Sequence, residues 1–418
     1  MFTPQVIFLT VLVFFLLVGI HEFGHFYFAK RANILAREFA IGFGPKLFSF
    51  KRGETRYTLR LLPLGGFVRM AGEDPEVVQV QPGHRVALEL KDGQVTKIYL
   101  DRLDTRANAI IGVVDRLDLE RELTITLGEQ DASRTFPVHP QAEIVGNGME
   151  TQIAPIDRQF PYKTVGQRAM TIFAGPMMNF VLAFLLFIAF TLLTGIPEHI
   201  QIGGVMKGSA AEAAHLQPGD IVLSVNHETI GADYEKFTGL IAQSANQAMI
   251  WQIRRGGQTQ TVEVTPRLMD GQVLAGVNIS FQSRRATLAE TISEAGKSMA
   301  FFTGEIFNGL KKLVTLQVKM DDLGGMVRMA QVTGQIASQG FASLVKWTAL
   351  LSLYLGIFNL LPFPALDGSR LVFIGLEGLR GKPIDPAKES MVHFIGFAML
   401  MLLMIVVTYN DILRLFKG

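Results

Sequence analysis

Two histidines and a glutamate stand at the end of an apolar run near the start of the chain. The run reads "VLVFFLLVGIHEFGHFYFAK", from Val11 to Lys30. Residues four apart share one face of a helix, so His21 and His25 can bind one Zn²⁺, and Glu22 can take a proton from a water held there. Ionisable groups are costly inside a membrane and usually mark a functional site. The spacing therefore predicts a metal site in a membrane segment; histidines that only reach the interface at a helix end are the simpler alternative.

A catalytic zinc site needs a third protein ligand and an open position. The stretch "NLLPFPALDGSR" places Asn359 and Asp367 on either side of two prolines, which break a helix and free its backbone groups. By topology this stretch and the first apolar run descend toward the same face of the membrane, so His21, His25 and Asp367 can lie at similar depth. We predict Asp367 as the third ligand; a carboxylate that only caps the turn at Gly368 is the alternative.

The composition limits the classes to which the protein can belong. An apolar fraction of 49% in 418 residues indicates a membrane protein with substantial polar parts. The net charge of +2 gives no basic field, so we expect no nucleic-acid partner. Because the chain has no cysteine, disulfides, thiolate zinc sites and a cysteine nucleophile are excluded. Any metal must be held by His, Asp or Glu.

Four apolar runs are long enough to cross a bilayer. They are Val6 to Tyr27, Thr171 to Ile196, Trp347 to Leu366 and Met391 to Val407. The first has no basic n-region and no cleavage site, so we expect it to stay in the protein. Basic residues crowd its far side from Lys30 onward and none precedes it, which predicts an N-terminus outside the cell. Arg414 and Lys417 argue against this orientation for the last run.

A second soluble part follows the second apolar run, at residues 200 to 283. It reads strand, short helix, turn, strand, and then a hairpin across Gly256 and Gly257. With the "PGD" turn at 218 to 220, it resembles a PDZ domain of the bacterial type in which the groove strand comes last. That resemblance implies a peptide-binding groove at Leu274, Ala275, Gly276 and Val277. An ordinary small β domain is the alternative.

Three further stretches have weaker signals. The run "RYTLRLLPLGGFVRM", 56 to 70, predicts a short hairpin or loop near the membrane, and 71 to 165 alternates as a small β-rich insert. From 286 to 339 the pattern is that of amphipathic helices broken at Gly324 and Gly325. These helices can lie on the membrane surface or pack against the spans.

Several motifs, in order and over nearly the whole chain, resemble one known family. They are "HEFGH", "LPLGGFVRM", "AGPMMNF", the PDZ-like part and "NLLPFPALDG". Together they are similar to the site-2 protease family of intramembrane zinc metalloproteases, and within it to the bacterial regulator-of-sigma-E protease branch. The family's fold then implies a polytopic α-helical membrane protein with four transmembrane helices, a membrane-associated β-loop, a small β-rich cytoplasmic insert and an extracytoplasmic PDZ domain.

The resemblance also assigns roles to residues of this sequence. It implies zinc ligands at His21, His25 and Asp367 and a catalytic glutamate at Glu22. It implies substrate contacts at Asn359 and, in a re-entrant β-loop, at Gly65, Gly66 and Phe67. Asn179 matches a sequence mark of the family, for which we expect a structural role: a buried amide bonded to backbone near a kink at Pro176.

These predictions divide the chain into eight parts. They are a first transmembrane helix (1–30), a β-loop region (31–70), the cytoplasmic insert (71–165), a second transmembrane helix (166–197), the PDZ domain (198–283), amphipathic helices (284–345), a third transmembrane helix with the Asn/Asp motif (346–368), and a cytoplasmic loop with the fourth transmembrane helix (369–418).

The predicted function is zinc-dependent cleavage of transmembrane segments at a site near the cytoplasmic side of the bacterial cell membrane. The resemblance implies single-span substrates of the anti-sigma-factor type, with remnant signal peptides as a further class, and the lipid bilayer as surroundings. Two hypotheses of other classes stand beside it. One is a metal transporter using the same ligands, although four spans without paired repeats are few for alternating access. The other is a non-catalytic scaffold that recruits partners through the PDZ domain.

Overall fold

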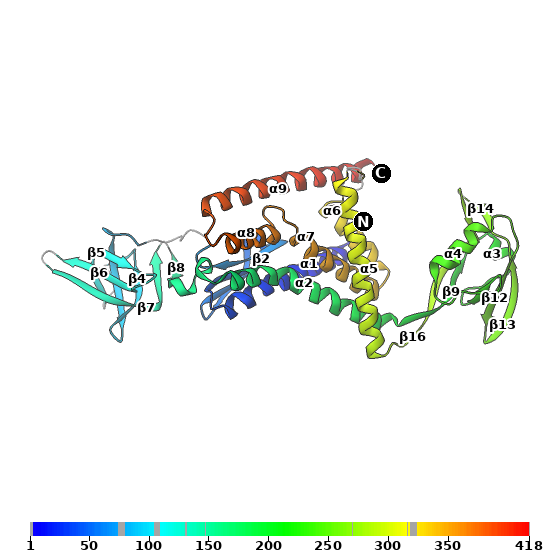
Figure 1. The fold of residues 1–418 in the computed structure, drawn as a ribbon, viewed down its shortest axis with the longest axis horizontal. Helices are drawn as coiled ribbons and strands as arrows, with labels where there is room; N and C mark the ends of the chain where they lie inside the picture. The colour runs from blue at the N-terminus through cyan, green and yellow to red at the C-terminus, as the bar shows by residue number, and fades with distance from the viewer. Residues whose placement is uncertain are drawn as a thin grey trace. The chain divides into compact units, whose positions relative to one another are not determined.

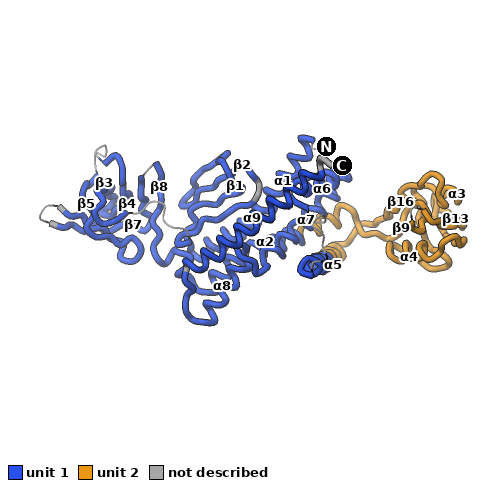
Figure 2. The backbone as a smooth tube through the Cα atoms, turned by 90° about the horizontal axis from the view of Figure 1, so that it is seen from above, with its two compact units in different colours: residues 1–184, 301–418 blue, residues 185–300 orange. Residues whose placement is uncertain are grey.

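The computed structural model describes residues 3–73, 80–103, 109–129, 132–146, 148–269, 271–315, 317 and 324–417. The chain forms two compact units (Figure 2). Unit 1 comprises Met1–Phe184 and Phe301–Gly418, and unit 2 comprises Leu185–Ala300.

In the described part of the chain, four helices are long and apolar enough to cross a membrane, which confirms the membrane-protein class (Figure 1). The four spans are α1 (Pro4–Arg31), α2 (Val165–Thr194), α7 (Phe341–Asn359) and Ala387–Arg414 of α9 (Pro386–Lys417). α1 extends beyond the predicted run at both ends. The Thr3 hydroxyl caps its first turn by accepting a hydrogen bond from the Val6 N–H.

The third predicted span is shorter than expected at its C-terminal end. α7 ends at Asn359, and Asp367 begins a separate helix, α8 (Asp367–Arg380). Pro362 and Pro364 lie in the connection, where their rings and missing N–H groups prevent a continuous helix. Asp367 therefore stands at a helix N-terminus and not within a span.

A long β-hairpin follows α1 directly. It consists of β1 (Ala36–Arg52) and β2 (Thr55–Met70), so the prediction of a short hairpin within 56 to 70 is wrong. Residues 38–41 of β1 have partners on both sides, 66–69 and 56–59, so they lie at the centre of the folded hairpin. The outer segment 66–70 runs beside α1. Large apolar side chains remain exposed on the hairpin, as is typical of a surface that meets lipid: Phe43, Leu47, Phe48, Phe50, Leu59, Leu61 and Leu62.

The insert after the hairpin is a small closed β-sheet. Its strands are β3 (Arg85–Lys91), β4 (Gln94–Tyr99), β5 (Ile110–Asp118), β6 (Thr124–Glu129), β7 (Ala132–Gly146) and β8 (Met149–Gln152). They pair in the order β4-β3-β5-β6-β7-β8, and β4 also pairs in parallel with β7, which closes the sheet on itself. Apolar side chains such as Val86, Ile125 and Phe136 fill its interior. Two short 3₁₀ helices, Ile156–Arg158 and Phe160–Tyr162, lead into α2.

Glu54, in the turn of the hairpin, joins the hairpin to the insert. Its carboxylate accepts a bidentate pair of hydrogen bonds from Arg158, with Nη2 at 2.8 Å from Oε2, and others from the side-chain amides of Gln141 and Gln152. Lys30, at the end of α1, lies 3.5 Å from the same carboxylate. The Arg158 and Gln152 hydrogen bonds lower the pKa of Glu54 to about 2. One carboxylate thus links α1, the hairpin and the insert.

The two predicted amphipathic helices differ in their surroundings. α6 (Met326–Ser338) packs against the spans, because the Trp347 indole of α7 donates to the Thr333 hydroxyl at 2.9 Å and Gly334 lies directly against Val6 of α1. α5 (Leu288–Val314) keeps large apolar side chains exposed: Leu288, Ile292, Phe301, Phe307, Leu313 and Val314.

In the described residues, unit 2 has a six-stranded sheet, a separate two-stranded sheet and two short helices. Its elements are β9 (Ile196–Val205), α3 (Ala210–Ala213), β10 (Ile221–Val225), β11 (Glu228–Thr229), α4 (Tyr234–Gln243), β12 (Met249–Arg255), β13 (Gln258–Val264), β14 (Arg267–Met269), β15 (Gln272–Leu274) and β16 (Val277–Arg284). The main sheet has the order β13-β12-β10-β9-β16, β11 pairs with β10, and β14 pairs with β15. β12 and β13 form the hairpin predicted across Gly256 and Gly257.

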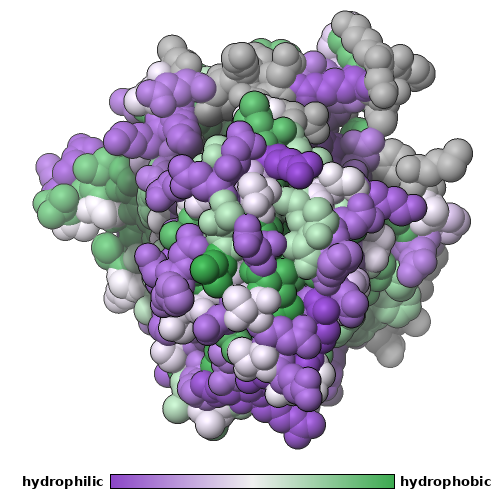
Figure 3. All heavy atoms as spheres, turned by 90° about the vertical axis from the view of Figure 1, so that its right-hand side faces the viewer, coloured by the Kyte–Doolittle hydropathy of each residue, from purple (hydrophilic) through white to green (hydrophobic). Residues whose placement is uncertain are grey.

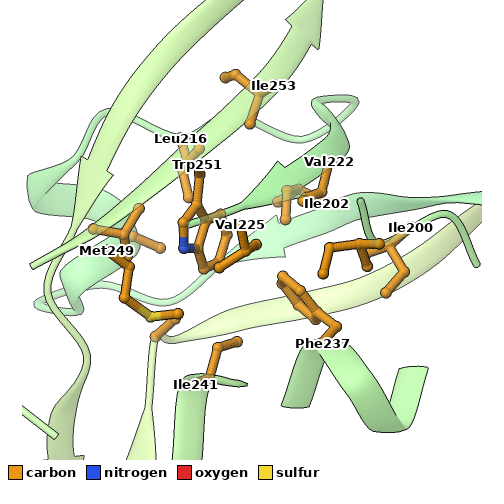
Figure 4. Packing of buried hydrophobic residues seen from close by; sticks show 14 of the residues in the cluster. Ile200, Ile202, Leu216, Val222, Val225, Phe237, Ile241, Met249, Trp251 and Ile253 are labelled. Carbon is orange, nitrogen blue, oxygen red and sulfur yellow. The ribbon is translucent and has the colours of Figure 1, made fainter. Parts of the chain in front are cut away.

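The core of unit 2 forms around Trp251, which is fully buried (Figure 4). Its ring meets that of Phe237, from α4, edge-on at a centroid distance of 5.1 Å. The Asp of the "PGD" turn, Asp220, is buried, accepts from the Gln217 N–H and pairs with the Arg255 guanidinium. The surface of unit 2 that faces the viewer in Figure 3 is mostly hydrophilic, as expected for a domain in water.

The Glu54 linkage predicts a pH-dependent stability of the hairpin. We expect Glu54→Gln to speed hydrogen exchange of the β1 and β2 amides about 5- to 30-fold at neutral pH, because charged hydrogen bonds are lost. The pKa of Glu54 is lower in the folded protein than in an unfolded chain. Its contribution is therefore complete above about pH 4.5 and falls as the pH drops toward 2. The difference between wild type and variant should shrink over that range.

The matched control is Glu150→Gln, in an ion pair with Lys97 that is more exposed and longer, at 3.7 Å. It should change exchange by less than about twofold. Equal effects of the two substitutions would show that Glu54 has no special linking role.

Candidate functional site

Three side chains from two distant segments converge in unit 1. His21 Nε2 lies 3.1 Å and His25 Nε2 3.3 Å from Asp367 Oδ2, and the two Nε2 atoms lie 3.2 Å apart. Asp367 comes from the first turn of α8, whereas both histidines lie on one face of α1. Among the described residues, these three side chains form a group that could hold a metal ion, with one ligand atom from each residue.

The distances fit a small divalent cation. Ligands at about 2.0 to 2.1 Å from a tetrahedral zinc are about 3.3 Å from one another, close to the separations observed here. Asp367 Oδ2 is buried and has no hydrogen-bond partner. A buried carboxylate oxygen without a partner is costly, and a cation bound between the three atoms would compensate for its charge. The residues therefore fit zinc.

Hydrogen bonds fix the orientation of both imidazole rings. His25 Nδ1 lies 2.9 Å from the backbone oxygen of Thr171, which can only accept, so Nδ1 carries the proton and Nε2 of the neutral ring has a free lone pair. His21 Nδ1 lies 3.0 Å from the side-chain amide of Asn179. If Nε2 of His21 bound a metal, Nδ1 would carry the proton and would need an acceptor. Rotation of the Asn179 amide by 180° would place its otherwise unpartnered oxygen at Nδ1 to accept this hydrogen bond.

The expected role of Asn179 is therefore wrong in one respect. Its side chain contacts His21 and not backbone near Pro176, although its own backbone oxygen accepts from the Ser352 hydroxyl of α7 at 2.8 Å. The sequence did not reveal the contact with His21, because the sequence alone does not show which side chain of another helix lies beside the Asn179 amide. One signal was available: a polar side chain within an apolar span is costly to bury, so the presence of Asn179 there indicates a polar partner.

Close helix packing brings α2 against His21 and His25, the predicted metal ligands. A side chain at Gly175 would place its Cβ 2.3 Å from His25 Nε2 and 2.9 Å from His21 Cε1. At Gly24 the Cβ would lie 2.2 Å from the Ala174 oxygen. Both positions are thus open only to glycine, and the packing of α1 on α2 places Thr171 and Asn179 beside the imidazoles.

Glu22 is buried beside the outer segment of the hairpin. A Cβ at Gly66 would lie 2.7 Å from Glu22 Cγ and 2.7 Å from the Ala40 oxygen. Gly65 has a φ of +145° and lies against the Phe43 ring, while the Phe67 ring is covered by the Arg60 guanidinium at 5.2 Å. The structure thus brings Gly66 to Glu22, with its two neighbours on the same hairpin segment.

Asn359 is the last residue of α7, partly exposed, eight positions before Asp367. Arg370, on the turn of α8 after Asp367, pairs with Glu73 and covers the Phe160 ring at 5.5 Å. These contacts hold the start of α8 against the segment that follows the hairpin.

The four predicted groove residues lie in unit 2. Leu274 ends β15, Val277 begins β16, and the turn between them contains Ala275, which is buried, and Gly276, with a φ of +78°. Two of their carbonyls have internal partners, since the oxygens of Ala275 and Gly276 accept from the N–H groups of Ala211 and Met206.

Comparison with known proteins gives one consistent result. The model of peptidase family M50 matches residues 9–403. The chain is 46% identical to zinc metalloprotease RasP of Geobacillus kaustophilus, over 97% of each chain. It is 43% identical to zinc metalloprotease RasP of Oceanobacillus iheyensis and 42% identical to the regulator of sigma-W protease RasP of Bacillus subtilis, each over 97% of this chain and 98% of the relative.

Among solved structures, a PDZ domain of an SdrC-like protein from Listeria monocytogenes matches 20% of this chain and 90% of its own length. Its identity of 13% and TM-score of 0.19 carry no argument about unit 2.

The contact between Gly175 and the imidazoles predicts a loss of metal. Gly175→Ala should lower the zinc content of the purified protein at least tenfold, because the methyl group displaces His25 from the ligand position. The measurement is metal analysis after gel filtration. Gly166→Ala, on the same helix with open space around its Cβ, is the control and should keep its zinc. Full zinc in both variants would contradict the ligand assignment.

Proposed function

The chain belongs to peptidase family M50, the site-2 proteases, and we propose that it cleaves single-span membrane proteins with the residues described above. As a member of this family it is a zinc-dependent intramembrane endopeptidase. The observation that carries the residue assignment is the convergence of His21, His25 and Asp367 on one point, with Glu22 next to His21.

Zinc, when bound, supplies a Lewis acid that polarises the scissile carbonyl and lowers the pKa of water. In our proposal Glu22 accepts the proton of the attacking water at its carboxylate and then donates it to the leaving amine. Asn179 and the Thr171 carbonyl keep both imidazoles in the tautomer that presents Nε2. Burial of Glu22 keeps bulk water away from its carboxylate.

The hairpin is suited to hold an unwound substrate. A helical substrate hides its peptide groups in internal hydrogen bonds, so it must become extended before cleavage. We propose that residues 66–70, the outer segment of β2, accept it as an added strand. Gly66 is the point where this segment approaches Glu22, because the absence of a side chain lets the strand lie directly against Glu22 and the Ala40 oxygen. Asn359, at the end of α7, is proposed to hydrogen-bond the freed substrate backbone.

We propose substrates of the anti-sigma-factor type, with remnant signal peptides as a further class. The name of the Bacillus subtilis relative, regulator of sigma-W protease, supports this class. Unit 2 is proposed to be an extracytoplasmic PDZ domain that selects substrates already shortened outside. It would do so by binding new C-termini at Leu274 to Val277 or by excluding large ectodomains through its bulk.

Substitution of Glu22 tests the mechanism. Glu22→Gln should lower the rate of cleavage of a reconstituted single-span substrate about 10²- to 10⁴-fold, because the amide cannot accept the proton. Zinc content should stay at the wild-type level, since Glu22 is not a ligand. Cleavage at the wild-type rate would rule out this mechanism. Loss of zinc in the variant would indicate that Glu22 is a zinc ligand.

The proposed orientation has its own test, because the chain contains no native cysteine. Ser133→Cys in the insert and Thr259→Cys in unit 2 both lie at exposed positions. With a membrane-impermeant maleimide on intact cells, Thr259→Cys should be labelled at once and Ser133→Cys only after permeabilisation. The reverse pattern would place the N-terminus and unit 2 in the cytoplasm.

A further inference from the structure

The connection between α7 and α8 contains a strained turn just before Asp367. The Leu366 N–H donates to the Phe363 oxygen at 3.1 Å, which closes a four-residue turn with Pro364 second and Ala365 third. Ala365 has a φ of +76°. This is the pattern of a type II turn, whose third position is normally glycine or asparagine because other side chains are unfavourable at positive φ. Something outside the turn must therefore stabilise this conformation.

The stabilising contact comes from α9. The Ala365 N–H donates to His393 Nδ1 at 3.1 Å. In a type II turn the central peptide, here the one between Pro364 and Ala365, is rotated by about 180° relative to its orientation in a type I turn. The Ala365 N–H therefore points to the opposite face of the turn. An acceptor at the position of His393 Nδ1 therefore favours the conformation with positive φ at Ala365.

Packing around His393 fixes the position of its ring. The Phe373 ring of α8 lies against it at a centroid distance of 5.7 Å. Because Nδ1 accepts from a backbone N–H, a neutral ring carries its proton on Nε2, which lies 3.7 Å from Glu389 Oε1 one turn earlier in α9. One turn later, a Cβ at Gly396 would lie 2.3 Å from Pro364 Cβ. At these positions α9 fits closely against the turn.

The turn determines where Asp367 lies. Leu366 caps α8, since its oxygen accepts from the Ser369 N–H at 3.2 Å and the Ser369 hydroxyl at 2.8 Å. Asp367 is the first residue of that helix, two positions after Ala365. A change from positive to negative φ at Ala365 would redirect the chain at this point. The carboxylate would then leave its position 3.1 and 3.3 Å from the imidazoles.

We propose that His393 is a positioning residue of the metal site. Its Nδ1 holds the Ala365 peptide in the type II turn and so keeps the Asp367 carboxylate in place for zinc. The inference rests on the proposed role of Asp367 as a zinc ligand. It assigns to the fourth span a defined contribution to metal binding, made through hydrogen bonding to backbone and not through coordination.

Zinc retention against a chelator tests this role without the need for cleavage. His393→Phe keeps an aromatic ring against Phe373 but has no acceptor, and it should release zinc about tenfold faster than wild type. His393→Asn loses the ring, but its amide oxygen lies near the former position of Nδ1. It should release zinc within about threefold of the wild-type rate. If His393→Phe retains zinc as wild type does, or if His393→Asn loses as much as His393→Phe, the proposal is wrong.

A second substitution separates positioning from general damage. Ala365→Gly allows positive φ without strain, so in the His393→Phe background it should restore zinc retention to within about threefold of wild type. A variant damaged only in packing would gain nothing from a glycine at position 365, and that result would overturn the proposal.

The series is measured in the Glu22→Gln background as well. Wild type that retains zinc without cleaving the substrate would refute the proposed function while leaving this series interpretable.

Discussion

The structure of unit 1 depends on one buried carboxylate that faces two imidazole lone pairs. When both imidazoles are neutral and present lone pairs, Asp367 Oδ2 has no hydrogen-bond donor, and a cation bound between the three atoms would neutralise its charge. Gly24 and Gly175 allow α2 to lie against α1, and the broken connection after α7 lets Asp367 approach from a helix end. Glycines in the apolar helices thus allow the close packing that brings three polar side chains together.

Much of the site could be predicted because each of its two segments carries a signal that is local in sequence. The i, i+4 histidines define their own face on a helix, and Asp367 follows prolines that mark a break. The peptidase character and zinc dependence of the family agree with that reading. The partners of the ligands could not be found in this way. Asn179 and Thr171 become relevant only when α2 packs on α1, and periodicity contains no information about which faces meet.

The fold shows the same division. Apolar length was sufficient to find the four spans, since a bilayer requires it of each helix separately. The hairpin was underestimated because residues 36–52 contain Gly42, Gly44 and Pro45, residue types that usually mark a turn or a loop. Closure of the insert through β4 and β7 is a parallel pairing between strands distant in sequence, which no turn signal reveals.

That closure also limits where an extended peptide chain can bind to the insert. Among the described residues of the insert, five strands have neighbours on both sides and only the four-residue β8 ends the sheet. A freshly cut, extended chain end has unpaired amide groups and adds readily to open sheet edges. A closed sheet gives it few places to bind. The insert is therefore held to the hairpin through Glu54 while it offers few open edges for strand addition.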